Sequence, residues 1–142
     1  MIIRGCFVGD APRFDARLRF GHAEGPVRFL ADTGASRSTI MDHDARMLGV
    51  RSEDLEPAPG CLVGIGGSIR CFVSRNVEIV LESDGGRFLL QQDLAIAQHD
   101  FAQLSPEEAA RILRIPSVLG RDYLNRFRFT CDYQAGIVQL ER

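Results

Sequence analysis

Short runs of β-branched and aromatic residues, separated by Gly, Asp and Asn, occupy most of the chain. Runs of this length between turn residues are typical of an all-β protein. Turn signals stand at Glu24-Gly25-Pro26, Ser83-Asp84-Gly85-Gly86 and Tyr133-Gln134-Ala135-Gly136. We therefore expect strands at 2–8, 14–20, 27–31, 61–63, 69–73, 76–81, 88–91, 94–97, 126–132 and 136–140.

Three short helices are predicted between these strands. Residues 42–48 form the first, and Gly49 after them is a typical C-terminal stop. The segment Ser105-Pro106-Glu107-Glu108 is a capping box with proline at the first helical position, which opens a helix over 106–113. A third helix is expected at 121–124. Helix is thus the minor component of a β-rich protein.

The composition limits the function classes. With 142 residues, 45% of them hydrophobic, the chain suits one compact core, so we expect residues 1–142 to form a single domain. Seventeen basic and nineteen acidic residues give a net charge of -2, and no Lys/Arg-rich run suggests a nucleic-acid partner. No run approaches the roughly 18 apolar residues of a membrane span, nor does the N-terminus resemble a signal peptide. We expect a cytoplasmic protein without a membrane partner.

Neither the cysteines nor the histidines are spaced as metal ligands. They are Cys6, Cys61, Cys71, Cys131, His22, His43 and His99. We interpret the cysteines as free thiols in a reducing cytosol, with a Cys61–Cys71 bridge across a hairpin as the alternative. The histidines are expected in surface or loop positions. The sequence therefore predicts no metal and no cofactor.

One carboxylate stands at the end of an apolar strand. In the segment Phe29-Leu30-Ala31-Asp32-Thr33-Gly34-Ala35-Ser36, the strand leads directly into a turn of small residues. Gly34 permits a tight backbone, and the hydroxyl of Thr33 can form a local hydrogen bond. Taken alone, an Asp-Thr-Gly triplet is more often an ordinary turn than a catalytic site.

A glycine-rich tip joins two strand-like runs at 61–72. The tip is Gly64-Ile65-Gly66-Gly67-Ser68, and a strand begins after it, whereas a phosphate-binding loop would require Lys followed by Ser or Thr at the start of a helix. A flexible hairpin tip with free backbone N–H groups is suited to closing over an extended peptide. An ordinary glycine-rich hairpin is the alternative.

Two further features follow along the chain. The apolar residues of 115–119 lead through Gly120 into a short helix, and 127–140 alternates like a half-buried terminal hairpin. The four features in this order resemble the retropepsin family of aspartic proteases. Asp32-Thr33-Gly34-Ala35 matches the family's catalytic motif, and the apolar residues before Gly120 match its second signature.

The likeness extends over nearly the whole chain, from about Phe14 to Leu140. The segment 64–70 looks like the flap tip of human immunodeficiency virus protease. Thr39-Ile40-Met41, which runs into a helix, and the terminal hairpin are more similar to the protease-like domain of the DNA-damage-inducible proteins and its bacterial relatives.

This resemblance implies an all-β acid-protease fold, a closed β-barrel with short helices and one lobe per chain. It implies a homodimer that cleaves peptides or proteins. The residues implied to be catalytic are Asp32, Thr33 and Gly34, and those implied to contact substrate are Ala35, Gly64, Ile65, Gly66 and Gly67. In the family, the threonine hydroxyls interlock across the dimer axis and the flap tips bind the substrate backbone.

The chain departs from the family pattern in two places. Viral members commonly have Asp where Ser36 stands, paired with the Arg that corresponds to Arg121. Here Arg121 needs another partner, either Asp122 or a backbone carbonyl. An additional segment, 98–114, precedes the second signature. It could cover the dimer edge, extend a substrate wall, or have no catalytic role.

Aspartic proteolysis needs one ionised carboxylate, which takes a proton from water, and one protonated carboxyl, which hydrogen-bonds the scissile carbonyl. The chain has one Asp-Thr-Gly motif and no second, so a monomer contains half a site. A two-fold dimer would bring both Asp32 carboxyls to the axis. At about 3 Å they would repel by roughly 5 kcal/mol at an effective dielectric of about 20, so the pair should keep one proton.

Two other functions remain open from the sequence. The chain could be a dimeric peptide-binding module with this fold that does not cleave, because fold does not guarantee chemistry. It could also be a structural β-domain in which Asp-Thr-Gly is only a turn. The other aspartates at turns or helix starts are expected to accept backbone N–H groups: Asp10, Asp42, Asp44, Asp93 and Asp122.

Overall fold

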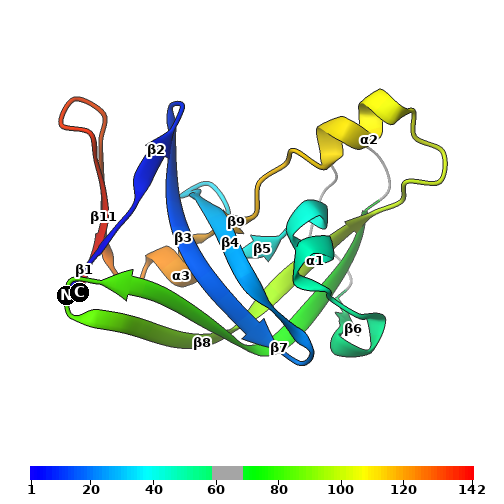
Figure 1. The fold of residues 1–142 in the computed structure, drawn as a ribbon, viewed down its shortest axis with the longest axis horizontal. Coiled ribbons are helices and arrows are strands. Elements are labelled where there is room, and N and C mark those ends of the chain that lie inside the picture. The colour runs from blue at the N-terminus through cyan, green and yellow to red at the C-terminus, as the bar shows by residue number, and fades with distance from the viewer. Residues whose placement is uncertain (59–68) are drawn as a thin grey trace.

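The computed structural model describes residues 1–58 and 69–142 and is built mainly of strands (Figure 1). The predicted strand at 61–63 and the glycine-rich tip lie outside the described residues. The strands are β1 (Ile2–Arg4), β2 (Cys6–Val8), β3 (Ala11–Phe20), β4 (Ala23–Ala31), β5 (Thr39–Ile40), β6 (Glu56–Pro57), β7 (Ile69–Ser83), β8 (Gly86–His99), β9 (Val118–Leu119), β10 (Arg128–Asp132) and β11 (Ile137–Glu141). The helices are α1 (Asp42–Leu48), α2 (Pro106–Ile112), α3 (Arg121–Leu124) and the 3₁₀ turn η1 (Ser52–Asp54).

The main sheet closes into a barrel. Its strand order is β2-β3-β4-β9-β5-β8-β7-β6, and β3 also pairs with β7. This additional pairing, Arg17 to Arg19 against Glu78 to Val80, closes a ring of β3, β4, β9, β5, β8 and β7. Closure removes the free edges of those strands. The all-β fold with a closed barrel and short helices, which the sequence predicted, is therefore confirmed.

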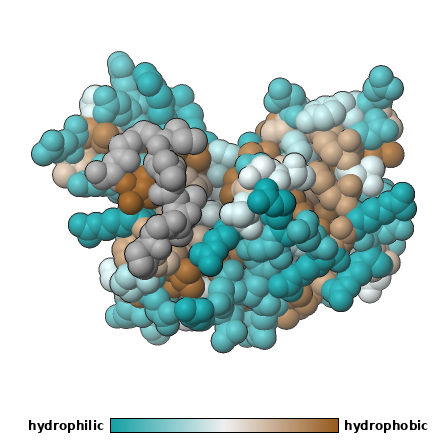
Figure 2. Space-filling view, turned by 180° about the vertical axis from the view of Figure 1, so that it is seen from behind, coloured by the Kyte–Doolittle hydropathy of each residue, from teal (hydrophilic) through white to brown (hydrophobic). Residues whose placement is uncertain are grey.

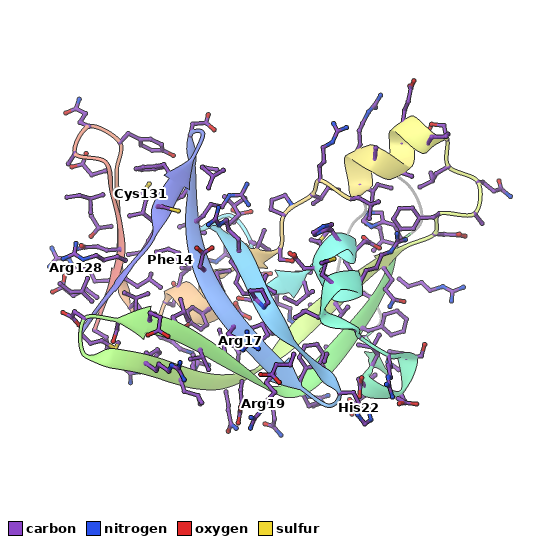
Figure 3. The ribbon with its side chains drawn as sticks, viewed as in Figure 1. Phe14, Arg17, Arg19, His22, Arg128 and Cys131 are labelled. Atoms are coloured by element: carbon purple, nitrogen blue, oxygen red, sulfur yellow. The ribbon has the colours of Figure 1, made fainter. Side chains whose placement is uncertain are left out.

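Strict alternation along β3 and β4 fills the barrel. Phe14, Leu18 and Phe29 are fully buried and Ala16 is buried between the first two, while Asp15 and Arg17 face solvent. Each such side chain contributes about 1.5–3 kcal/mol on burial. Phe14 also contacts the ring of Phe129 edge-on at 6.2 Å, which joins the barrel to β10, the strand that carries Arg128 and Cys131 (Figure 3).

The two ends of the chain lie side by side in a second, three-stranded sheet of order β1-β11-β10 (Figure 1). The N-terminal amine of Met1 donates to the carbonyl of Arg142 at 2.9 Å, and the N–H of Arg142 donates back at 3.0 Å. Gly5 separates β1 from β2, where we expected one strand, because a Cβ there would lie 2.4 Å from the carbonyl oxygen of Arg13. The chain thus passes from the terminal sheet to the main sheet at this residue.

Three predicted strand breaks are wrong, one of them between the predicted strands 88–91 and 94–97, which form the single strand β8. The turn predicted at Glu24-Gly25-Pro26 lies inside β4, and the chain instead reverses around Gly21, which has a φ of 51°. The polar residues after Val73 do not end a strand, because β7 continues through a bulge between Ser74 and Val77. The turn predicted before Gly86 is confirmed, and it separates the long strands β7 and β8.

The predicted helices are present. Helix α1 has the expected bounds and ends at Gly49, whose φ of 73° suits glycine. Helix α2 begins at the predicted cap, where the Ser105 hydroxyl accepts the N–H of Glu108 at 3.1 Å, and it ends at Ile112. In the described ranges, no helix is both long enough and apolar enough to cross a membrane.

The cysteines differ in state. Cys6 and Cys131 are free, as the sequence analysis expected. Cys71 is disulfide-bonded, so the interpretation as a free thiol is wrong for this residue. Cys61, which the alternative interpretation paired with it, lies outside the described residues.

Candidate active site

Asp32 follows directly after the buried strand β4, beside β9. The two strands are parallel, with Leu30 opposite Val118, and the backbone N–H of Asp32 donates to the carbonyl of Leu119 at 3.0 Å. In Figure 1 these strands lie between one projecting part of the chain, which carries α2, and another, which carries β2 and β11. Seen from behind, the surface is hollowed between these two projecting parts (Figure 2). The end of β4, which Asp32 follows in the sequence, therefore lies toward the hollowed side of the molecule (Figures 1 and 2).

The turn after β4 is held by the side chain of Asp32 itself. Its Oδ1 accepts the backbone N–H of Gly34 at 2.8 Å, and its carbonyl accepts that of Ala35 at 3.2 Å. A Cβ on Gly34 would lie 3.1 Å from Oδ1, so glycine leaves room for this bond. Asp32 is half-buried, while Thr33 and Gly34 are exposed. Among the described residues, Oδ2 has no hydrogen-bond partner and is available for chemistry.

Arg121 fastens the same turn from α3. Its Nη1 donates to the carbonyl oxygens of Thr33 at 2.9 Å and Gly34 at 3.2 Å, and its backbone N–H donates to the carbonyl of Ala35 at 2.9 Å. Of the two partners that the sequence left open, the backbone carbonyl is therefore the one observed. The Arg121 guanidinium binds backbone carbonyls of the turn and needs no carboxylate partner at position 36. Ser36 can therefore occupy the position where viral members have Asp.

A buried serine joins the loop after the turn to α3. Ser38 is fully buried, and its N–H and hydroxyl donate to Oδ1 of Asp122 at 2.8 and 2.7 Å. Its Oγ also accepts the N–H of Gly120 at 3.0 Å. A Cβ on Gly120 would lie 2.6 Å from the carbonyl carbon of Arg37, so only glycine allows this contact. The predicted structural role of Asp122 is confirmed, whereas the role of Ser38 was missed because its partner is 84 positions away in the sequence.

A second carboxylate, Asp42, is buried with His99. Oδ1 of Asp42 accepts the backbone N–H of His99 at 2.8 Å, and Oδ2 contacts Nδ1 of its ring at 2.5 Å. The two side chains are 5% and 1% exposed. The expected surface or loop position of His99 is wrong, because it ends β8 inside the protein. His22 and His43 are exposed, as predicted.

The other predicted carboxylate roles are local. Asp93 accepts the backbone N–H of Asn76 at 3.1 Å, as expected for a structural aspartate. Asp44 accepts the hydroxyl of Ser117 at 2.6 Å instead of a backbone group. Asp10 lies in the exposed turn between β2 and β3. None of these residues lies in the turn that holds Asp32.

The predicted flap residues Gly64, Ile65, Gly66 and Gly67 lie outside the described residues, whereas Ala35 lies beside Asp32. The strands that flank the undescribed segment are paired, Pro57 opposite Phe72, and the N–H of Ala58 donates to the carbonyl of Cys71 at 3.0 Å.

The additional segment 98–114 is partly barrel and partly helix. Gln98 and His99 belong to β8 and pair with Arg70 and Ile69. The rest of the segment carries α2, in the projecting part seen in Figure 1. The guanidinium carbon of Arg46 lies 4.4 Å from the ring centroid of Phe101, and this contact joins the segment to α1. The segment is therefore anchored to the barrel at its start.

Comparisons with known proteins identify the same fold. Residues 16–122 match the family described as aspartyl protease. The retropepsin-like aspartic protease from Rickettsia conorii superposes with a TM-score of 0.56 at 20% identity, covering 99% of this chain and 88% of that one. The EIAV protease, solved with an inhibitor, gives 0.52 at 18% identity and 84% and 89% coverage. The retroviral protease-like domain of Ddi1 from Leishmania major gives 0.53 at 12% identity and 92% and 94% coverage. No curated protein matches the chain.

Proposed function

The chain belongs to the aspartyl protease family and has a retropepsin-like fold, and from this premise we propose that it is a homodimeric aspartic endopeptidase. Each chain provides one lobe, formed by residues 1–142. Two copies of Asp32 meet at the two-fold axis and activate a water for attack on a peptide bond. The substrate is an extended peptide or protein segment, covered by the glycine-rich segment 64–67 of each chain.

One observation carries the proposal: the Asp32 turn is fixed while one carboxylate oxygen stays uncommitted. Oδ1 accepts the N–H of Gly34 at 2.8 Å, and Arg121 holds the carbonyls of Thr33 and Gly34. A catalytic carboxylate must be held in position yet keep a lone pair for water. Fixation of the backbone by Arg121 meets both requirements.

The reaction divides the two carboxyls into different roles. The ionised Asp32 accepts a proton from the water while the water oxygen attacks the scissile carbonyl carbon. The protonated Asp32 of the partner copy hydrogen-bonds the carbonyl oxygen and then supplies the proton to the leaving nitrogen. Because the two carboxyls share one proton, neither acts as a fixed acid or base, and the pair titrates as a unit.

The test is cleavage of a diverse peptide library by the parent and by Asp32→Asn, with and without a statine-type inhibitor. General acid–base catalysis contributes about 10²–10⁴-fold, so we expect the variant to lose at least that much activity while it keeps the parent's circular dichroism spectrum. The inhibitor should abolish parental cleavage. Dilution below the dimer dissociation constant should also reduce activity per chain.

Three outcomes distinguish the candidate functions. Cleavage lost through both the substitution and the inhibitor supports the peptidase. Peptide binding without cleavage by the parent would identify a catalytically silent binding module instead. A monomer that neither binds nor cleaves peptides would leave only a structural β-domain, with Asp32 as part of a turn.

A further inference from the structure

A cavity opens beside the loop that follows the Asp32 turn. It has a volume of about 890 Å³ and is lined by the 36–38 loop, by Pro57 and Ala58 at the end of β6, by residues inside β7 and β8, and by α3 with the turn that follows it. Three arginines and two aspartates contribute to its lining: Arg37, Arg75, Arg126, Asp93 and Asp122. The cavity is therefore polar and carries more positive than negative side chains.

The two aspartates of the cavity already have partners. Asp122 accepts both donors of Ser38, and its Oδ2 accepts the amide of Gln92 at 3.4 Å. Asp93 accepts the N–H of Asn76 at 3.1 Å and Nη1 of Arg75 at 2.8 Å. Arg75 is bound on its other side by Glu56 at 3.0 Å. Both carboxylates and Arg75 therefore already have hydrogen-bond partners.

Arg37 and Arg126 differ from Arg75. In the part of the chain that the structure describes, the guanidinium of Arg37 forms no hydrogen bond or ion pair, and Arg126 donates only its Nε, to the backbone carbonyl of Asp122 at 3.3 Å. Both residues are exposed. Their terminal nitrogens are planar, charged donors of the kind that bind carboxylates in pairs. The charge of Arg37 reaches into the cavity, since it adds to the Asn76 N–H and Arg75 in holding the pKa of Asp93 below its usual range.

The cavity lies within reach of a peptide bound at Asp32. Arg37 is five residues beyond Asp32 in the sequence, and an extended chain spans at most about 3.6 Å per residue, so their Cα atoms are at most about 18 Å apart. A bound strand rises about 3.3 Å per residue. A substrate side chain that enters the cavity therefore belongs to a residue within about five positions of the scissile bond.

We infer that this cavity selects an acidic side chain of the peptide substrate, whose carboxylate is bound by Arg37 and Arg126. The inference rests on the proposed function and names a substrate class for it: extended peptides with Glu or Asp within about five residues of the cleaved bond. Because the dimer has two such cavities related by its axis, acidic residues are selected on both sides of the bond.

The experiment compares kcat/KM for peptides that differ only by Glu, Gln or Lys at one position, scanned over five positions on each side of the bond. At the position that enters the cavity, the parent should prefer Glu by about tenfold, the effect of one charge-assisted hydrogen-bonded pair. Arg37→Gln should reduce the preference to about threefold or less, and Arg37→Glu should reverse it toward Lys. The preference should shrink at 1 M salt.

Arg87→Gln is the matched control. Arg87 is exposed and ion-paired with Glu82 at 3.2 Å in the β7–β8 hairpin, and it does not line this cavity. Its variant should keep the parental preference for Glu. Equal cleavage of Glu and Gln peptides by the parent at every position, or a preference unchanged in Arg37→Glu, would overturn the inference while leaving the peptidase itself intact.

Equilibrium binding separates this inference from the proposed function. Fluorescent Glu and Gln peptides are titrated into the parent, Asp32→Asn and the double variant Asp32→Asn/Arg37→Glu. Suppose that the parent cleaves no peptide, yet binds Glu peptides about tenfold more tightly than Gln peptides in an Arg37-dependent manner. The peptidase proposal then fails and the acidic selection stands. If no peptide is bound or cleaved, both are overturned.

Discussion

Asp32 and Asp42 lie close together in the sequence, and the structure holds them in opposite ways. Asp32 is half-buried on a turn, and among the described residues its side chain accepts a single hydrogen bond, through Oδ1. Asp42 is 5% exposed, and both of its oxygens are occupied by His99. The carboxylate suited to chemistry is thus held by one of its oxygens and by the Arg121 contacts to its turn, which leaves the other oxygen free among the described residues, whereas the structural carboxylate uses both oxygens.

The largest expected effect tests this contrast directly. Asp42→Ala removes the carboxylate from a buried imidazole and from a buried N–H, so we expect it to lower the free energy of unfolding by about 3–5 kcal/mol. Asp32→Ala loses only the hydrogen bond to the Gly34 N–H and should cost about 1 kcal/mol or less. Urea unfolding at one fixed protein concentration measures both. Equal losses in the two variants would contradict the contrast.

Gly120→Ala tests how firmly the site is supported from beneath. The added methyl group would lie 2.6 Å from the carbonyl carbon of Arg37, so the loop after the Asp32 turn must move. We expect a loss of about 1–3 kcal/mol in stability and a lower kcat/KM. Gly85→Ala is the control, because the nearest atom to its Cβ, Ser83 Oγ, is 4.0 Å away. Equal effects of the two substitutions would show that the packing at Gly120 is not what positions the turn.

Tyr123 provides a buried polar group of a third kind. It lies in α3, fully buried, and its hydroxyl has no hydrogen-bond partner among the described residues. Burial accordingly raises the pKa of Tyr123. Tyr123→Phe removes an unsatisfied group, so stability should stay the same or rise by up to about 1 kcal/mol in thermal or urea unfolding. A clear loss of stability would mean that the hydroxyl is bound in solution.

The smallest effect is expected for a carboxylate that is paired at the surface. The Arg28 guanidinium, hydrogen-bonded to Asp15 at 2.6 Å, holds the pKa of that carboxyl below its usual range. A lowered folded-state pKa stabilises the protein above the unfolded-state pKa, and this contribution is lost as pH falls through the folded value. Both side chains are more than half exposed, so Arg28→Gln should cost about 0.5 kcal/mol or less at pH 6.

Unfolding measured between pH 6 and pH 2 checks the sign of this effect. The difference between the parent and Arg28→Gln should disappear toward pH 2, where Asp15 is protonated in both the folded and the unfolded state. It should also diminish at 1 M salt. A difference that persists at pH 2 would assign the effect to packing of the Arg28 side chain instead of its charge.

The features that the sequence predicted correctly are those with local causes. Helix α1 and its stop at Gly49, the cap of α2 and the turn before Gly86 each depend on residues within a few positions. The Asp32 motif and the Gly120 signature are also local. Their order along the chain resembles the retropepsin family, and this resemblance implied the acid-protease fold, while the apolar run before Asp32 placed it at the end of a strand.

The features that were missed depend on residues far apart in sequence. His99 is buried because Asp42, 57 positions away, binds it, and Ser38 is fixed by Asp122, 84 positions away. The polar residues around Arg75 looked like a strand break but form a bulge, since Asp93 on the next strand satisfies both Arg75 and the N–H of Asn76. These hydrogen bonds form only when the closed barrel brings the two residues together, so a local sequence pattern does not predict them.

The most direct test of the central claim is activity in mixed dimers. The parent is mixed with increasing amounts of Asp32→Asn, the subunits are allowed to exchange, and cleavage is measured per parental chain at constant total protein. If each site needs two Asp32 carboxyls, a ninefold excess of the variant should leave about one tenth of the activity, because random pairing places most parental chains beside an inactive partner. Activity per parental chain that does not change with added variant would contradict the account.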